Sequence, residues 1–566
     1  MKKISFLLLS AFCLFANRGF AQTFSSIDIF TGAGDAVPMS MTEYNGKVYF
    51  AATGSNAQGT ELWVTDGTQA GTHLVSDILP GPGSSNPYGF IVANNFLFFI
   101  ADDSIHGSEL WTTDGTTTTM VVDINPGTTS GAISNTTVMN NKLYFSANDG
   151  SAGQELWVSD GTPGGTSLLK DIQPGPISSN PVGYQTDLEN GLLITGFNLY
   201  NNRLYFRADD GVHGTELWST DGTSAGTAIF ADMLPGPGSG AAYCVTPLNG
   251  NLIMGATDSV HGYELWISDG TPAGTSMLKD INTGSGSSSA GANTGFVAMG
   301  GKLYFAAYSP GTGAGYELWQ TDGTTAGTTI VKDILPGPGS SYAGYYGFGI
   351  LNGKLYFSAN DSVNGHQLWS SDGTPSGTTL VKILSDITPD NALPIKFITY
   401  NGQLIFTATP NTASGRQLWT TDGTSAGTHM ISPAVAPNAS PMANAAGLVP
   451  YCLYNGNLLV EANFNSIGDE LWIYHTAGVG ITEMSGGIGI SVYPNPFNTS
   501  VTLSGLDSRE KYTMQLLDVT GRQYYSTAVP QPSENTQVMM PELSTGIYIM
   551  RVSGQNSSST FRLVRK

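Results

Sequence analysis

Short runs of alternating apolar and polar residues recur along most of the chain, and turn-forming residues separate them. Residues 302–305 (Lys-Leu-Tyr-Phe) show the pattern directly after the pair Gly300-Gly301. A period of two is typical of a half-buried strand, whereas no stretch combines the 3.6-residue period of a helix with helix caps. The pattern therefore predicts an all-β chain.

Nine tryptophans mark a repeat. Each one follows a leucine in the triplet Glu/Gln-Leu-Trp, and successive tryptophans are 46 to 61 residues apart. They are Trp63, Trp111, Trp157, Trp218, Trp266, Trp319, Trp369, Trp419 and Trp472. A period near 50 residues indicates a solenoid or a propeller.

Each repeat contains the signals for four short antiparallel strands. Asn-Gly, Asn-Asn or Gly-Gly precedes the second strand in all nine repeats, as at Asn45-Gly46, and such pairs tolerate the positive φ of a type I′ hairpin. Asp-Gly-Thr follows the third strand in eight of the nine. Four strands joined by three turns make one propeller blade. The prediction is a single large β-propeller of about nine four-stranded blades, or alternatively eight blades plus a cap.

The two ends of the repeat region fit a closed ring. Residues 26–29 resemble a fourth strand without its first three, and the last repeat lacks Asp-Gly-Thr. We expect residues 25–30 to form strand pairs with residues 455–484 of the last repeat, because closing the ring hides sheet edges that invite aggregation. The longest gap between tryptophans contains an insertion at about 181–199, which we expect to be an irregular loop suited to a unit-specific function.

The repeat resembles the ELWxxDGT repeat family of secreted bacterial proteins. The matching segments are ELWVTDGT (61–68), ELWTTDGT (109–116), ELWVSDGT (155–162), ELWSTDGT (216–223), ELWISDGT (264–271), ELWQTDGT (317–324), QLWSSDGT (367–374), QLWTTDGT (417–424) and the degenerate ELWIYHTA (470–477). The resemblance covers residues 22–485 and implies little about activity.

Residues 488–566 break the pattern, because they contain no tryptophan and carry a slight excess of basic residues. Their short strands predict a small Ig-like β-sandwich. Three motifs, Val492-Tyr-Pro-Asn-Pro-Phe497, Leu517-Asp-Val-Thr-Gly-Arg522 and Leu543-Ser-Thr-Gly-Ile-Tyr548, resemble the type A sorting domain of the Bacteroidetes type IX secretion system. The resemblance implies contact with the type IX translocon and sortase. The sorting-signal residues it assigns are Pro494, Asn495, Pro496, Asp518, Gly521, Arg522, Gly546, Tyr548 and Lys566.

The N-terminus indicates export. Residues 1–21 combine Lys2 and Lys3, a short apolar stretch and small residues before Gln22, which is the pattern of a cleaved signal peptide. No later segment is apolar enough for a transmembrane helix. We therefore expect a protein that passes through the periplasm and is then secreted or held on the outer-membrane surface. Cys244 and Cys452 occupy similar places in distant repeats and are expected to be buried free thiols.

Charge narrows the choice of partner. Lys and Arg number 22 against 43 Asp and Glu, a net charge of −21, which disfavours nucleic acid. The repeat region alone has 12 bases and 38 acids, or −26, and half of all acids occupy motif positions.

The motif residues have a structural and a functional interpretation. The tryptophans are expected to pack in the core, although an exposed indole could stack on a sugar ring. The Asp-Gly-Thr aspartates are expected to accept hydrogen bonds from turn amides, with Ca²⁺ as the alternative and the one candidate cofactor. These aspartates are Asp66, Asp114, Asp160, Asp221, Asp269, Asp322, Asp372 and Asp422. His106, His213 and His261 occupy three equivalent turns and are expected to have a structural role in those turns.

The sequence matches one catalytic pattern, and its context argues against a catalytic role. Gly222–Gly226 and Gly423–Gly427 satisfy G-x-S-x-G, but they lie in a β-turn slot rather than a strand-to-helix elbow. The leading hypothesis is a binding or adhesion scaffold for an extracellular glycan or protein. The alternatives are a polysaccharide-acting enzyme that uses loop acids such as Asp187, Glu189 and Asp390, and a structural surface-layer component.

Overall fold

The structure is a computed structural model. It describes residues 23–493 apart from 32–33, 188–191, 241, 293, 386–391, 411–415, 433–450, 465–467 and 476–490. It also describes residues 500–565 apart from 505, 507–510, 518–522, 530–534, 541–542, 544–545 and 555–557. The chain divides into two compact units, Phe24–His475 and a smaller one made of Thr476–Lys566 with Met1–Thr23.

Strands account for almost all the secondary structure of the described residues, as the alternating pattern predicts. The exceptions are two single 3₁₀ turns, η1 (Pro163–Gly165) and η2 (Pro310–Thr312). Among the residues described, no helix has the length and apolarity needed to span a membrane.

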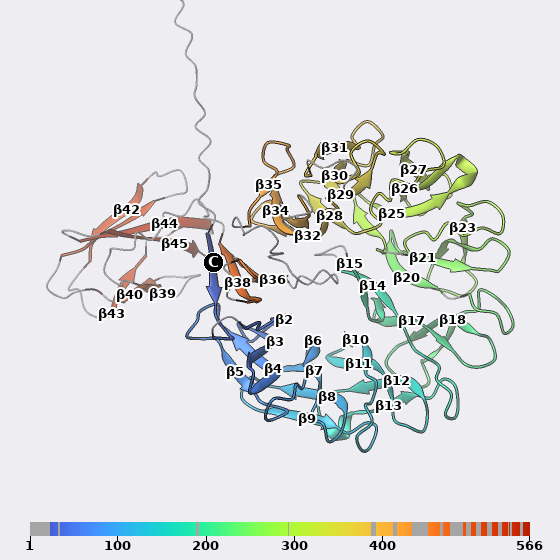
Figure 1. The fold of residues 1–566 in the computed structure, drawn as a ribbon, viewed down its shortest axis with the longest axis horizontal. Coiled ribbons are helices and arrows are strands. Elements are labelled where there is room, and N and C mark those ends of the chain that lie inside the picture. Colours follow the sequence, from blue (N-terminus) through green and yellow to red (C-terminus); the bar gives the residue numbers. More distant parts are fainter. Residues whose placement is uncertain are drawn as a thin grey trace, which may run out of the picture. The chain divides into compact units, whose positions relative to one another are not determined.

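The larger unit contains nine four-stranded sheets, here called units 1 to 9 (Figure 1). Units 1 to 3 are β2 (Met39–Tyr44), β3 (Lys47–Ser55), β4 (Gln58–Thr65) and β5 (His73–Ser76); β6 (Tyr88–Ala93), β7 (Phe96–Asp102), β8 (Ser108–Thr113) and β9 (Thr118–Val122); and β10 (Ser134–Met139), β11 (Lys142–Asn148), β12 (Gln154–Ser159) and β13 (Ser167–Lys170).

Units 4 to 6 are β16 (Asn198–Tyr200), β17 (Arg203–Asp209), β18 (Thr215–Thr220) and β19 (Ala228–Ala231); β20 (Tyr243–Leu248), β21 (Asn251–Thr257), β22 (Tyr263–Ser268) and β23 (Ser276–Lys279); and β24 (Val297–Met299), β25 (Lys302–Ser309), β26 (Ala314–Thr321) and β27 (Thr329–Lys332). Units 7 to 9 are β28 (Phe348–Leu351), β29 (Lys354–Asn360), β30 (His366–Ser371) and β31 (Thr379–Lys382); β32 (Ile395–Tyr400), β33 (Gln403–Ala408), β34 (Gln417–Thr421) and β35 (His429–Met430); and β36 (Tyr451–Tyr454), β37 (Asn457–Ala462) and β38 (Glu470–His475) with β1 (Thr23–Ile27).

The turn between the first two strands has the predicted backbone in every unit. Asn45 and Gly46 have φ values of 49° and 70°, and the equivalent pair has positive φ in the other eight units. This is the conformation that a two-residue type I′ hairpin requires. The pairs that the sequence places there are therefore explained by backbone geometry.

The apolar cores lie between neighbouring sheets. In one cluster, Leu265 and Cys244 of unit 5 pack against Phe305 and Trp319 of unit 6, and all four side chains are buried. Cys452 is likewise buried, and neither cysteine takes part in a disulfide, as predicted. Each sheet thus buries its two faces against the sheets before and after it.

The N-terminal strand completes the last sheet, as the sequence predicts. β1 is the hydrogen-bonded neighbour of β38, and the Ile29 amide donates to Glu470 Oε2 at 2.8 Å. Units 1 and 9 also meet directly, because the Tyr454 hydroxyl donates to the Gly46 carbonyl oxygen and Phe50 packs in one core with Leu471. The described sheets follow one another around a ring (Figure 1), an arrangement consistent with a propeller-like fold.

The insertion before unit 4 differs from the irregular loop that the sequence predicts. Its described part forms a separate hairpin of β14 (Tyr184–Asp187) and β15 (Leu192–Thr195). β14 lies against β20 of unit 5 and β15 against β10 of unit 3, so the hairpin spans unit 4 on the inner side of the ring (Figure 1). The insertion interrupts the repeat, so the sequence offered no aligned strand from which this pairing could be predicted.

The smaller unit has two sheets. One contains β39 (Ser491–Tyr493), β40 (Ser500–Ser504) and β43 (Asn535–Met539), and the other contains β42 (Gln523–Ala528), β41 (Thr513–Leu517), β44 (Gly546–Ser553) and β45 (Ser558–Arg565). Val501 from the first sheet and Leu516 and Met550 from the second share one buried core. The unit is therefore a small two-sheet β domain.

Candidate functional site

The glutamate of the repeat motif holds the loop that leads to the next unit. Glu61 is 0% exposed, and its Oε2 accepts hydrogen bonds from the Ile78 amide at 2.8 Å and the Ser85 hydroxyl at 2.6 Å. Its Oε1 accepts from the Ser85 amide at 2.9 Å. The same contacts, 17 and 24 residues ahead, recur for Glu155, Glu264 and Glu317. The sequence reveals the repeated glutamate but not this role, because the partners lie across a loop with no periodicity.

Burial raises the pKa of these glutamates. The pKa rises to about 7 for Glu109, Glu216, Glu317 and Glu470, because the carboxylate is desolvated, although backbone amides that donate to it act in the opposite direction. Perturbed carboxyl groups are a common sign of an active site. Here the same perturbation recurs around the ring, and each carboxylate accepts from backbone amides of the connection that leads to the next unit.

Two units show that a neutral acceptor serves the same purpose. Gln367 and Gln417 replace the glutamate and are buried. Gln367 Oε1 accepts from the Leu384 amide at 2.7 Å, and Gln417 Oε1 accepts from the Ser432 hydroxyl at 2.6 Å. The position therefore requires an acceptor rather than a charge.

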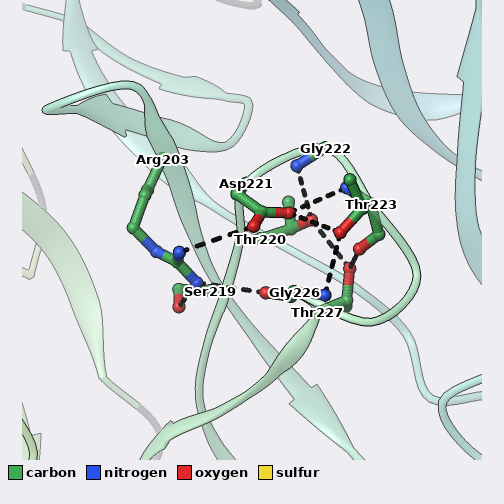
Figure 2. Close-up of polar contacts among 8 residues, drawn as sticks. All are labelled: Arg203, Ser219, Thr220, Asp221, Gly222, Thr223, Gly226 and Thr227. Atoms are coloured by element: carbon green, nitrogen blue, oxygen red, sulfur yellow. Dashed lines mark hydrogen bonds and ion pairs between the residues drawn. The ribbon is translucent and has the colours of Figure 1, made fainter.

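The Asp-Gly-Thr aspartate organises the turn after the third strand (Figure 2). Asp221 Oδ1 accepts from the Thr223 amide at 2.9 Å and from its hydroxyl at 2.8 Å, and the Thr223 hydroxyl accepts from the Gly226 amide. The Thr220 and Thr227 hydroxyls are 2.7 Å apart and close the base of the turn. These contacts are those of an Asx-type turn.

In unit 4 an arginine also contacts this turn. The Arg203 guanidinium donates to the Ser219 hydroxyl and the Gly226 carbonyl oxygen at 3.0 Å, and lies 4.0 Å from Asp221 Oδ2 (Figure 2). The ion pair is partly exposed, so it contributes about 1 kcal/mol or less.

All eight candidate Ca²⁺ aspartates make the same contacts within their own turns. In units 1 to 8 Oδ1 accepts from the threonine two residues ahead, for Asp66, Asp114, Asp160, Asp221, Asp269, Asp322, Asp372 and Asp422. These bonds hold the pKa of Asp114 at about 2. Within the described ranges, no three acidic, histidine or cysteine side chains gather as metal ligands would.

The nine tryptophans face the interfaces between sheets. Seven are at most 9% exposed, namely Trp157, Trp218, Trp266, Trp319, Trp369, Trp419 and Trp472. Trp63 and Trp111 are partly buried and pack against neighbouring cores. In two places a lysine of the preceding unit covers the ring, with Lys279 Nζ 6.0 Å from the Trp319 centroid and Lys332 Nζ 5.9 Å from that of Trp369. Such burial leaves little of the indole face for a sugar.

The three candidate histidines lie in equivalent turns between the second and third strands. His106 Nδ1 is 2.7 Å from Asp103 Oδ2, and that hydrogen bond raises the pKa of His106. His213 and His261 pair with Asp210 and Asp258 in the same way. Each pair is confined to its own turn.

The remaining candidates are placed only in part. In the smaller unit Gly546 begins β44, and Tyr548 is buried in the core. Asp187 ends β14. The candidates that lie outside the described residues are Glu189, Asp390, Pro494, Asn495, Pro496, Asp518, Gly521, Arg522 and Lys566.

The motif glutamates and the Asp-Gly-Thr aspartates accept hydrogen bonds from their own loops and turns, whereas the indole N–H of eight repeat tryptophans is buried without a partner among the described residues. The motif acids fix loops and turns, and the indoles fill the interfaces. Residues that differ between units are therefore the stronger candidates for contact with a ligand.

The chain was compared with curated proteins and with solved structures. No curated protein matches it at a significant level. Among solved structures, PorZ of Porphyromonas gingivalis, a surface component of the type IX secretion system, matches at 13% identity over 94% of this chain and 75% of that one, with a TM-score of 0.36. A puromycin hydrolase mutant matches at 13% identity over 77% and 60%, with a TM-score of 0.34. The extracellular domain of a putative hybrid two-component system from B. thetaiotaomicron matches at 9% identity over 94% and 86%, with a TM-score of 0.29.

The smaller unit has a family match. Residues 491–566 match the family described as "Secretion system C-terminal sorting domain". The match agrees with the three motifs at 492–548 and with the two-sheet β domain seen here. A type IX sorting domain implies that the chain interacts with that secretion machinery and is carried to the cell surface or released. The family match and the three motifs thus give the same segment, residues 491–566, the similarity to a secretion system C-terminal sorting domain.

Proposed function

We propose that the chain is an exported β-propeller of nine ELWxxDGT units that acts as a binding or adhesion scaffold for an extracellular glycan or protein. The observation that carries the proposal is the internal use of the motif glutamates and of the Asp-Gly-Thr aspartates. Glutamates such as Glu61 hold loops, and aspartates such as Asp221 hold turns, while β1 closes the last sheet. Such a ring supplies a rigid frame, and its unit-specific loops are free to contact a ligand.

Export supports the placement of this scaffold outside the cell. Residues 1–21 have the features of a signal peptide, and residues 491–566 match the sorting-domain family. Deleting residues 488–566 should leave the protein in the periplasm with its ring folded. Fractionation and protease resistance of the truncated chain would measure both properties, and arrival of the truncated chain at the surface would contradict the proposed route.

Binding and turnover separate the scaffold from an enzyme. The purified protein would be applied to an array of glycans and extracellular matrix proteins and, in parallel, incubated with the same polysaccharides. We expect binding without release of reducing ends. Release of reducing ends without stable binding would replace the scaffold by a polysaccharide-acting enzyme.

A further inference from the structure

Units 5 to 7 carry aromatic residues at a cross-strand position that is polar in other units. The cross-strand pair that follows the motif glutamate's pair, between the second and third strands, is Thr53–Thr60 in unit 1 and Asp209–Thr215 in unit 4. In unit 6 it is Tyr308–Tyr316, whose ring centroids are 5.1 Å apart. Units 5 and 7 place Tyr263 and His366 on the third strand at this position. The repeat does not require these rings, because other units fold with small polar residues there.

The connection between units 6 and 7 adds three more tyrosines. Tyr342 has φ 52° and its amide donates to the Tyr316 carbonyl oxygen at 3.0 Å. Asn86 makes the same contact in unit 2, with φ 47°. Asparagine tolerates this left-handed conformation, whereas a bulky residue there costs on the order of 1–2 kcal/mol. Tyr342 thus occupies a left-handed backbone position that the equivalent residue of unit 2, Asn86, adopts more easily.

The rings form one continuous surface, here called the tyrosine platform. Its members are Tyr308, Tyr316, Tyr342, Tyr345 and Tyr346, with His366 beneath them. Tyr316 and Tyr342 are stacked with centroids 5.8 Å apart, and Tyr342 and Tyr345 meet edge to face at 5.3 Å. All five tyrosines are partly exposed, and His366 is 6% exposed.

The platform is fixed from below. The Tyr345 amide donates to the Tyr342 carbonyl oxygen at 3.0 Å. Glu317 holds the neighbouring Ser341 through its amide at 2.9 Å and its hydroxyl at 2.5 Å. The carbonyl oxygen of Gly344 accepts from the Thr294 hydroxyl at 2.9 Å. A surface already held in one arrangement loses little entropy when it binds.

The chemistry of the platform selects its ligand. It contains no acidic or basic side chain other than His366, and burial lowers the pKa of His366, so this imidazole is neutral near pH 7. Glu317 follows the platform residue Tyr316 in the sequence, but its side chain is 0% exposed. The net charge of −21 disfavours an anionic polymer. Tyrosine rings offer an apolar face together with a hydroxyl that can hydrogen-bond.

We propose that the tyrosine platform of units 6 and 7 is a binding site for a neutral oligosaccharide, whose apolar ring faces stack on the tyrosines while its hydroxyls meet theirs. The inference rests on the proposed scaffold function and names the ligand class of one site on it. The sugar lies across Tyr345 and Tyr346, with Tyr316 and Tyr342 as the stacked base.

Calorimetric titration of the full chain with defined probes tests this assignment. The probes are the neutral hexasaccharides of β-glucan, xylan and mannan, an anionic oligogalacturonate, and choline as a cation that also binds aromatic faces. The variants are Tyr345→Ala with Tyr346→Ala, and the milder Tyr345→Phe with Tyr346→Phe. Tyr88→Ala is the matched control, because Tyr88 is 46% exposed in unit 2, outside the platform.

We expect at least one neutral probe to bind, with affinity about ten-fold or more weaker in the double alanine variant and unchanged in Tyr88→Ala. The double phenylalanine variant keeps the stacking faces and should lose less affinity than the double alanine variant. Binding of only oligogalacturonate or choline would overturn the assignment, as would neutral-sugar binding that the double alanine variant retains. The latter result leaves the scaffold intact and moves the site elsewhere, whereas failure of every glycan and matrix protein on the array overturns the scaffold itself.

Discussion

Replacing Glu317 by alanine should loosen the connection between units 6 and 7 and leave distant units intact. The side chain is 0% exposed. Its oxygens accept from the Ile334 amide at 3.0 Å, the Ser341 amide at 2.9 Å and the Ser341 hydroxyl at 2.5 Å. Alanine removes both acceptors and leaves all three donors in the same buried space.

The magnitude follows from these three donors. A buried donor without an acceptor costs about 1–3 kcal/mol. The Ser341 hydroxyl also reaches the Tyr316 carbonyl oxygen at 3.4 Å, so the two amides dominate the loss. We therefore expect Glu317→Ala to reduce local stability by about 2–6 kcal/mol. Glu317→Gln retains one acceptor, as Gln367 does naturally, and should cost about half as much.

The pH dependence separates charge from hydrogen bonding. Burial raises the pKa of Glu317 from 4.5 to about 7, so the folded protein binds this proton more tightly than the unfolded chain. The stabilisation that Glu317 contributes through this proton is fully present below pH 4.5 and is lost as the pH rises to about 7. The difference is about 3 kcal/mol, at 1.36 kcal/mol for each pKa unit. Glutamine does not titrate, so the cost of Glu317→Gln should be smaller at pH 8 than at pH 5.

Hydrogen exchange measures this local effect. Protection factors of the Ile334 and Ser341 amides would be compared at pH 5 and pH 8 in the wild-type protein and both variants. The Ile78 and Ser85 amides, which Glu61 holds in unit 1, serve as internal reference. The reasoning is refuted if Glu317→Ala leaves the protection at Ile334 and Ser341 unchanged, or if Glu317→Gln costs more at pH 8 than at pH 5.

Three further predictions concern other parts of the ring. Gly226→Ala should destabilise unit 4 by about 2 kcal/mol, because a Cβ there would lie 2.1 Å from Asp221 Oδ1 and displace the turn's acceptor; thermal unfolding would show it, and an unchanged midpoint would contradict the contact. Removing residues 23–27 should expose the edge of β38 and promote self-association, visible as a larger species by light scattering, whereas a monomer of unchanged stability would argue against closure by β1. Burial raises the pKa of Cys244 to about 12, so the thiol should resist alkylation at pH 8 until the ring is denatured, and rapid labelling of the native protein would show that it is accessible.

Local chemistry made much of the fold predictable. Asn45-Gly46 and its equivalents identify type I′ turns because few residue pairs tolerate two positive φ values, and all nine pairs have them. The lone strand at residues 26–29 indicated closure because a fourth strand without its own sheet must pair elsewhere. These inferences depend only on near neighbours in the sequence.

Contacts across loops and between units could not be predicted in the same way. Glu61 reaches residues 17 and 24 positions ahead, and nothing in the periodicity of the chain marks that distance. The tyrosine platform joins Tyr316 to Tyr342 across a unit boundary, and only the fold brings the two rings together. The hairpin of β14 and β15 was hidden because its insertion interrupts the repeat against which other strands were aligned.

The seam between β1 and β38 has a consequence for the order of folding. Contacts between neighbouring units span about 50 residues, whereas the Ser25 hydroxyl and His475 Nε2, 3.0 Å apart, are separated by 450. Loop-closure entropy for that separation is about 5 kcal/mol, since it grows as (3/2)RT ln n. The units can thus assemble in sequence, each on the one before, while the ring stays open. A chain that stops before residue 470 has no place for its first strand, so the seam can form only after the ninth sheet has been synthesised.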